Sequence, residues 1–278
     1  MKKNLKKIIV GFVAVALSLV VTACGNSKTS SANKETTVKV GIIGSDDRVW
    51  NDIAKRLKKQ NINVKLVKFT NYDQPNQALD AGDVDLNAYQ HIYFLDNWND
   101  AHNTDLTPIG NTVIAPLAVF SHKIKSIKEL NKGDVVTLPN DATNQARALQ
   151  LLETAGLITL KKGVKFPTPN DVATNKSGIK LKPLDASQTA RSLDDATAAI
   201  VNNGVALDAN LSYDDAIYTE KKLRKKSEIW VNVIAAQKKD KNNKVYKKIV
   251  AAYQNKATAK VIKDTYKGST IPAWNYKF

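Results

Sequence analysis

From Thr36 onward the chain alternates short apolar runs with segments of helical spacing, and this alternation constrains the fold more than any other feature. Residues 37–43 and 64–69 are short and rich in β-branched side chains, as strands are. Between them, residues 49–59 carry apolar side chains at intervals of four, which predicts a helix. A further strand is predicted at 84–89. Strands joined by helices in this order predict an α/β fold with a largely parallel sheet.

A second α/β unit follows residues 111–120, where Pro116 suits a sheet edge or a crossing between two lobes better than a central strand. Residues 163–178 are predicted to form a long loop. The remaining predicted strands are 135–138, 181–184, 205–207 and 229–235, and the remaining helices are 143–155, 190–202, 244–253 and 257–266.

Two α/β units with a returning terminal segment describe a bilobed receptor. We expect residues 36–118 and 233–278 to form lobe 1 and residues 119–232 to form lobe 2. Ligands of open α/β sheets bind beyond the carboxyl ends of the strands, so a cleft between two such lobes is the expected ligand site. Closure of the lobes about a hinge would then bury the ligand.

The N-terminus has the features of a lipoprotein signal peptide. Four lysines precede an apolar run at 8–21, and Thr22 and Ala23 stand before Cys24, the only cysteine in the chain. This pattern predicts a signal peptide at 1–23 and a Cys24 that carries a lipid. The alternatives are a single-span membrane anchor or a plain signal peptide, but the apolar run is shorter than the roughly 20 residues of a spanning helix.

Residues 24–35 are predicted to be a flexible tether, because residues 25–35 contain no large apolar side chain. Two or more acyl chains, such as diacylglycerol with an added palmitate, hold a protein stably on a bilayer, whereas one does not. The expected location is therefore the extracytoplasmic face of the cell membrane.

Composition excludes several classes of protein. One cysteine and three histidines leave no disulfide framework, no thiolate metal cluster and no His-rich metal receptor, so no metal or other cofactor is expected. The formal charge of +16 falls to +12 when the four lysines of the signal peptide are removed. The lysines are scattered and are not interleaved with aromatic residues, which favours a solvated basic exterior over a nucleic-acid surface.

Candidate site residues follow the predicted strand at 84–89. Tyr89 and His91 could line a slot for an apolar side chain. Aromatic residues at this spacing are also typical of a core, and a lone histidine is often a helix cap.

Asn144 and Arg147 are three residues apart at the start of a predicted helix that Asp141 or Thr143 would cap. They share a helix face near the N-terminus, where anions are favoured, and a guanidinium there can grip a carboxylate. The alternative is a surface arginine beside a capping box.

Asn202 and Asn232 each follow an apolar run. Asparagine is depleted in strands, so Asn232 inside a predicted strand suggests a buried amide that pairs with a ligand group. Turn formation explains Asn202 equally well.

Over nearly all of the mature length the chain resembles the methionine-binding lipoproteins of ABC importers, the MetQ/NlpA family. The stretches that carry the resemblance are Asn71-Tyr72, Pro75-Asn76, 82–91 (GDVDLNAYQH), 110–112, 123–126, Pro139-Asn140-Asp141, Thr143-Asn144, Arg147, 191–195 (RSLDD) and Val231-Asn232. They occur in the family's order.

The resemblance implies a two-lobed type II binding-protein fold and the delivery of methionine, with L-methionine expected first, to a permease and its ATPase. It also implies that Arg147 and Asn144 hold the ligand carboxylate, and that Asn202 and Asn232 complete the contacts to the ligand backbone, including the ammonium. Tyr72, Tyr89 and His91 would surround the ligand side chain. We expect a monomer without catalytic residues, bound to the membrane through its lipid and not to nucleic acid.

The sequence departs from the family pattern at three places. The family's proline after Asn-Asp is Ala142, its His-x-Pro-Tyr is replaced by His91 and residues 92–94, and an aromatic after Asn202 is replaced by Val205. D-methionine, a methionine-containing dipeptide or another amino acid therefore stays open as the ligand, and so does which of Tyr93 and Phe94 enters the pocket. A surface enzyme on a similar scaffold is the other alternative, although no G-x-S-x-G, H-E-x-x-H or P-loop sequence occurs.

Overall fold

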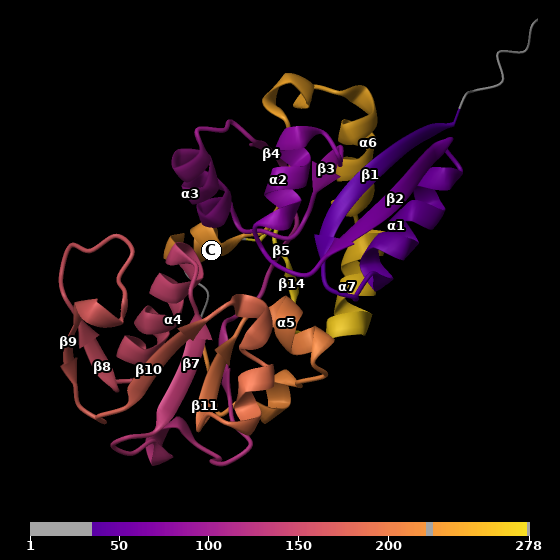
Figure 1. Cartoon of the computed structure of the whole chain (residues 1–278). Helices are drawn as coiled ribbons and strands as arrows, with labels where there is room; N and C mark the ends of the chain where they lie inside the picture. Colours follow the sequence, from indigo (N-terminus) through magenta and orange to yellow (C-terminus); the bar gives the residue numbers. More distant parts are fainter. Residues whose placement is uncertain (1–34, 221–224, 277–278) are drawn as a thin grey trace, which may run out of the picture. The chain divides into compact units, whose positions relative to one another are not determined.

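Two five-stranded sheets organise the computed structural model, which describes residues 35–220 and 225–276 (Figure 1). The first sheet contains β1 (Thr36–Ile43), β2 (Ile62–Phe69), β3 (Leu86–Asn87), β4 (Thr107–Asn111) and β13 (Val233–Ala236), in the order β2-β1-β3-β13-β4. The second contains β6 (Ala118–Phe120), β7 (Val135–Pro139), β10 (Lys180–Leu184), β11 (Ala198–Val201) and β12 (Tyr218–Thr219), in the order β10-β7-β11-β6-β12. Two short ladders pair β5 (Val113–Ile114) with β14 (Ile271–Pro272) and β8 (Ile158–Leu160) with β9 (Val172–Asn175).

Both sheets are mixed rather than largely parallel, so that part of the sequence prediction is only half right. In the first sheet β1 pairs in parallel with β2 and β3, whereas β13 runs antiparallel to β3 and β4. In the second sheet β7 pairs in parallel with β10 and β11, whereas β6 runs antiparallel to β11 and β12. The reversed strand in each sheet is the one that the chain enters after crossing from the other sheet. A crossing strand arrives from the opposite side, which periodicity along the sequence does not reveal.

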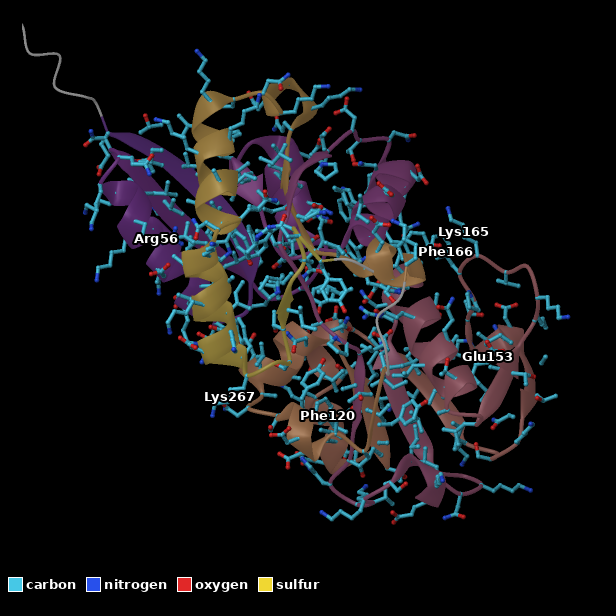
Figure 2. The ribbon with its side chains drawn as sticks, turned by 180° about the vertical axis from the view of Figure 1, so that it is seen from behind. Arg56, Phe120, Glu153, Lys165, Phe166 and Lys267 are labelled. Carbon is cyan, nitrogen blue, oxygen red and sulfur yellow. The ribbon has the colours of Figure 1, made fainter. Side chains whose placement is uncertain are left out.

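Helices cover both faces of the first sheet. On one face lie α1 (Arg48–Lys58), α6 (Lys244–Tyr253) and α7 (Lys256–Tyr266), and on the other α2 (Gln74–Ala81) and α3 (Ile92–His102). In Figure 1 the C-terminal α6 and α7 lie beside the N-terminal β1, β2 and α1. Alternate residues of β13 serve the two faces, since Ile234 packs with α1 and α6 while Val233 packs with α2 and α3. Arg56, labelled in Figure 2, donates to the carbonyl of Ala252 and to Thr258.

The second sheet is built the same way around β11. Ala198 and Ile200 pack with α4 (Ala142–Thr154), while Ala199 and Val201 pack on the opposite face with α5 (Asn203–Asp208) and with Phe120. Every residue of β11 is buried. Short 3-10 turns complete the fold: η1 (Ile127–Glu129), η2 (Pro169–Asp171), η3 (Ala186–Gln188), η4 (Arg191–Asp194), η5 (Tyr213–Asp215), η6 (Lys225–Trp230) and η7 (Lys238–Asp240).

The strands predicted at 37–43, 64–69, 135–138 and 181–184 and the helices at 49–59, 143–155, 244–253 and 257–266 are confirmed with small shifts. Two other predictions are wrong. Residues 190–202 form η4 and β11 instead of a helix, and residues 205–207 lie in α5 instead of a strand. A short apolar run that is buried on both faces has no period that separates a strand from a buried helix.

Three further predictions differ from the structure in the boundaries of their elements. The strand expected at 84–89 is confined to Leu86–Asn87, the one at 229–235 to Val233–Ala236 after η6, and the loop at 163–178 contains η2 and β9.

The N-terminal predictions lie outside the described residues. This holds for the signal peptide at 1–23, for Cys24 and for all of the tether except Glu35. Within 35–220 and 225–276, no helix has the length and apolar character needed to span a bilayer. The first sheet draws its strands from 36–111 and 233–236 and the second from 118–219, while the limits of the two lobes stay a prediction.

Candidate ligand-binding site

A cavity of about 190 Å³ is lined by residues that follow strands of both sheets. The seven site residues predicted from the sequence all line it: Tyr72, Tyr89, His91, Asn144, Arg147, Asn202 and Asn232. The fold therefore brings together side chains that lie up to 160 positions apart, and their role toward a ligand stays a prediction.

His91 both caps a helix and faces the cavity. Its Nδ1 accepts the backbone N–H of Phe94 at 3.0 Å, which caps α3, and its Nε2 lies 3.4 Å from Oδ1 of Asn144. The ring meets the Trp230 ring edge-on, with centroids 4.9 Å apart. Burial, and then the nearby Arg147, lower the pKa of His91 to about 3. His91 is therefore neutral, and with Nδ1 accepting, its proton sits on Nε2.

Three aromatic rings form an apolar slot at one side of the cavity. The centroids of Tyr72, Tyr89 and Phe94 are 6.0 to 6.1 Å apart in each pair. The Tyr89 hydroxyl donates to the backbone carbonyl of Tyr72 at 2.6 Å, and burial raises the pKa of both phenols, so both stay neutral. The sequence left open which of Tyr93 and Phe94 enters the pocket. In the structure Phe94 lines the cavity, whereas Tyr93 packs on Trp230 and on Phe166, which is labelled in Figure 2.

Asp141 is the N-cap of α4 and holds Asn144 in place. Its carboxylate accepts the backbone N–H of Asn144 at 3.0 Å and the side-chain NH₂ at 3.0 and 3.1 Å. Burial raises the pKa of Asp141, and these hydrogen bonds oppose that shift. Asn144 in turn accepts a hydrogen bond from the NH₂ of Asn202 at 2.8 Å. The donors of Asn144 thus point to Asp141, and the amide serves to orient Asn202.

Asn202 presents an acceptor to the cavity. It is the N-cap residue of α5, but its side chain makes no capping hydrogen bond. Turn formation therefore explains the place of Asn202 in the chain but not the role of its side-chain amide. Its Oδ1 is buried without a hydrogen-bond partner in the described structure. A buried amide oxygen that lacks a donor costs free energy, so this atom is an acceptor with unused hydrogen-bonding capacity.

Asn232 precedes β13 rather than lying inside it. Its backbone N–H donates to the carbonyl of Val113 at 2.8 Å, its carbonyl accepts from Thr112 at 2.7 Å, and its NH₂ donates to the carbonyl of Tyr89 at 3.2 Å. It also bridges to His91 in a two-residue antiparallel contact. Asn232 therefore links the loop that carries His91 to the crossing segment at 112–113.

Arg147 is buried, with only 5% of its surface exposed, which rules out a surface arginine. Its Nε and Nη2 bind the carboxylate of Glu220 at 2.8 and 2.5 Å, and Nη2 also donates to the carbonyl of Ala115 at 2.9 Å. The guanidinium carbon lies 4.8 Å from the centroid of the Trp230 ring. Sequence reasoning missed both Glu220 and Trp230, because nothing in the local pattern marks a partner 73 residues from Arg147.

The rim of the cavity carries hydrogen bonds between residues of the two sheet regions. Asp208, at the end of α5, accepts from the backbone N–H of Ser45 at 2.9 Å and from its hydroxyl at 2.7 Å. Asn203 donates to the Thr270 hydroxyl at 2.8 Å. The set as a whole offers a cation, an amide acceptor and an aromatic slot, which suits recognition of a small zwitterion. In the described ranges, no three His, Cys, Asp or Glu side chains gather as metal ligands would.

Comparison with known proteins extends this description to a family. The model of the family described as NlpA lipoprotein matches residues 38–274. The D-methionine-binding lipoprotein MetQ of Yersinia pestis is 36% identical over 274 residues, which cover 96% of this chain and 98% of that protein.

Solved structures agree. The substrate binding protein of a methionine transporter from Streptococcus pneumoniae has a TM-score of 0.81 at 37% identity, with 86% of this chain and 96% of that chain covered. A nutrient binding protein from Burkholderia cenocepacia bound to methionine has a TM-score of 0.81 at 40% identity, with 85% and 99% covered. The predicted two-lobed α/β binding-protein fold is confirmed.

Proposed function

Because this chain belongs to the NlpA lipoprotein family, we propose that it captures methionine outside the cell membrane and delivers it to the permease and ATPase of an ABC transporter. The names of its relatives support this proposal, since they include a D-methionine-binding lipoprotein and the binding protein of a methionine transporter. Such relatives bind and transport, and we propose that this chain likewise carries out no catalysis of its own.

The composition of the cavity is the observation that carries the proposal. A buried guanidinium, an unpartnered amide oxygen and a slot of aromatic rings face one space. The carboxylate of the amino acid would bind Arg147, and its ammonium would donate to Asn202 Oδ1, with Asn232 beside it. The thioether would enter the slot of Tyr72, Tyr89 and Phe94 next to His91, where sulfur–aromatic contacts are favourable.

Binding of this kind requires closure rather than bond making. The cavity is lined from the regions of both sheets, so a ligand that contacts Arg147 on α4 and Tyr89 after β3 would favour the closed arrangement over an open one. A lipid on Cys24 would keep this monomeric receptor close to its permease, which raises the effective concentration without a new contact.

Titration calorimetry of the purified chain tests the assignment. L-methionine, D-methionine, a methionine-containing dipeptide and a set of other amino acids should be compared, together with mass spectrometry of any ligand that co-purifies. We expect methionine to bind most tightly. A clear preference for an amino acid without a thioether would overturn the assignment, and stronger binding of D-methionine than of L-methionine would set the enantiomer.

Arg147→Ala tests the proposed carboxylate site. Loss of a buried charged hydrogen-bond donor should weaken methionine binding by at least about 3 kcal/mol, or roughly a hundred-fold. Arg191→Ala, which removes the same charge from an exposed position on η4, should leave the affinity unchanged. Equal affinity of Arg147→Ala and the unaltered protein would remove Arg147 from the site.

A further inference from the structure

Glu220 occupies one whole edge of the Arg147 guanidinium. Its two carboxylate oxygens accept from Nε at 2.8 Å and from Nη2 at 2.5 Å, a side-on pair in which both partners are largely shielded from water. The side chain of Arg147 is 6% exposed and that of Glu220 is 22% exposed. Paired hydrogen bonds of this type fix the plane of the guanidinium as well as its charge.

Glu220 is itself anchored to the backbone. Its Oε2 accepts the backbone N–H of Leu117 at 3.0 Å, and its own N–H donates to the carbonyl of Leu117 at 2.9 Å. Leu117 is 1% exposed, so its N–H has no access to water. If the carboxylate swung away, this N–H and a buried guanidinium would both lose a partner, and each loss is costly. Glu220 is therefore held against Arg147 rather than resting there by chance.

The edge taken by Glu220 limits how a ligand can reach Arg147. Nη2 also donates to Ala115, and the Trp230 ring covers one face of the guanidinium. Nη1 alone makes no hydrogen bond within the described residues, and it carries two hydrogens. A ligand carboxylate is thus offered the Nη1 end, because the fork of Nε and Nη2 is already used by Glu220.

The pair also sets the local charge at the guanidinium end of the cavity. The charges of Arg147 and Glu220 sum to zero, and the neighbouring His91 is neutral. A zwitterion adds no net charge to such a cavity, whereas an anion that lacks the ammonium would add an uncompensated negative charge beside Glu220. Burial of an uncompensated charge is strongly unfavourable.

We propose that Glu220 is a positioning and specificity residue: it holds Arg147 with Nη1 toward the ligand and neutralises the guanidinium, so that the site selects zwitterionic amino acids over the matching anions. This rests on the proposed function, since it takes the ligand to be an α-amino acid. Glu220 acts through Arg147 and needs no contact of its own with the ligand.

The test compares two ligands of nearly the same shape. L-methionine is zwitterionic, and 2-hydroxy-4-(methylthio)butanoate has a hydroxyl in place of the ammonium and a net charge of −1. Calorimetry at one ionic strength gives Kd for both with the unaltered chain, Glu220→Gln and Glu220→Asp. Glu129→Gln, the same change at an exposed position of η1, serves as the control.

We expect Glu220→Gln to weaken methionine binding at least ten-fold and to shift the ratio of the two Kd values at least ten-fold toward the hydroxy acid. Glu220→Asp keeps the charge and shortens the reach, so both ligands should weaken while the ratio stays near that of the unaltered chain. If Glu220→Gln does not fold, Glu220→Asp still tests the positioning role, because unchanged methionine binding by Glu220→Asp would contradict it. Glu129→Gln should change neither value.

Two results would overturn the proposal. Tighter methionine binding by Glu220→Gln would mean that Glu220 competes with the ligand for Arg147 and is displaced by it. Equal weakening of both ligands by Glu220→Gln, at an unchanged ratio, would mean that Glu220 only supports the fold. If the unaltered chain prefers another amino acid, the proposed function fails, yet the same ratio can be measured with that amino acid and its own α-hydroxy acid.

Discussion

At the scale of single residues, His91 shows how one side chain serves the fold and the cavity together. Nδ1 caps α3, and Nε2 turns toward Asn144. The sequence left a capping histidine and a site histidine as alternatives, and the geometry gives His91 both positions. The cost of this arrangement is that the imidazole must stay neutral in a buried place next to Arg147.

The neutral His91 predicts a loss of stability in acid. Its pKa of about 3 in the folded chain lies below the ordinary value of 6.5, so below about pH 6.5 the unfolded chain binds a proton that the folded chain refuses. The free energy of unfolding should therefore fall as the pH drops from about 6.5 toward 3, by up to about 1.4 kcal/mol per pH unit. Urea denaturation from pH 7.5 to 4 measures this.

His91→Asn isolates that contribution. Asparagine can cap α3 but does not titrate, so the variant should lose less stability per pH unit than the unaltered chain. Asp141 has a raised pKa and acts in the opposite direction, but it is present in both proteins and cancels in the comparison. His122→Asn, at an exposed histidine, is the control. Parallel pH curves for the unaltered chain and His91→Asn would contradict the prediction.

At the scale of elements, the short strand β3 positions the site through a buried amide network. Asn87 lies in the middle of the first sheet and pairs with Gly41 of β1 and Ala235 of β13. Its NH₂ donates to Asn76 Oδ1 at 2.8 Å, and Gln90 donates to Asn76 and Asn87 at 2.6 and 3.0 Å. The network ties the loop that carries Tyr89 and His91 to the start of α2.

Asn87→Ala should destabilise the fold by about 1–3 kcal/mol, because it leaves buried amide groups of Asn76 and Gln90 with fewer partners. It should also weaken ligand binding, since the loop that carries His91 loses its anchor. Urea denaturation and calorimetry measure the two effects. Asn170→Ala, at an exposed position on η2, should show neither. Unchanged stability of Asn87→Ala would mean that the amide network does not contribute to the free energy of unfolding.

At the scale of the whole molecule, the contact of Asp208 with Ser45 joins the end of α5 to the end of β1 at the rim of the cavity. Gly44 makes this approach possible. Its φ is +78°, and a Cβ at this position would lie 1.8 Å from Oδ2 of Asp208. A side chain there would be strained in its backbone and would also push the carboxylate away.

Asp208→Ala should speed release of the ligand, because it removes two hydrogen bonds that hold the rim closed. An exposed charged contact of this kind is worth roughly 1–2 kcal/mol, so the dissociation rate should rise about 5- to 30-fold. Stopped-flow fluorescence of Trp50 and Trp230, which line the cavity, reports the rate. Gly44→Ala should act in the same direction, and Asp214→Ala on η5 should not. An unchanged rate in both rim variants would remove this contact from the closing mechanism.

Much of this protein follows from the sequence by itself. Apolar spacing of 3.6 residues defines α1, α6 and α7, because each of these helices buries one stripe and exposes most of the rest. Short polar motifs at strand ends identify the residues that line the cavity, because strand ends of an α/β sheet converge there. Local rules suffice wherever the cause of a structure lies within one turn or one strand.

Tertiary structure decided those elements and contacts that depend on residues remote in the sequence. Residues 198–201 form a strand whose two faces are covered by α4 and α5. Residues 205–207 lie in α5, which packs on one of these faces. Phe94 rather than Tyr93 lines the cavity, since Tyr93 packs on the rings of Phe166 and Trp230. The partner of Arg147 is the remote Glu220, since a buried charge takes the nearest opposite charge in space, and distance along the chain says nothing about that.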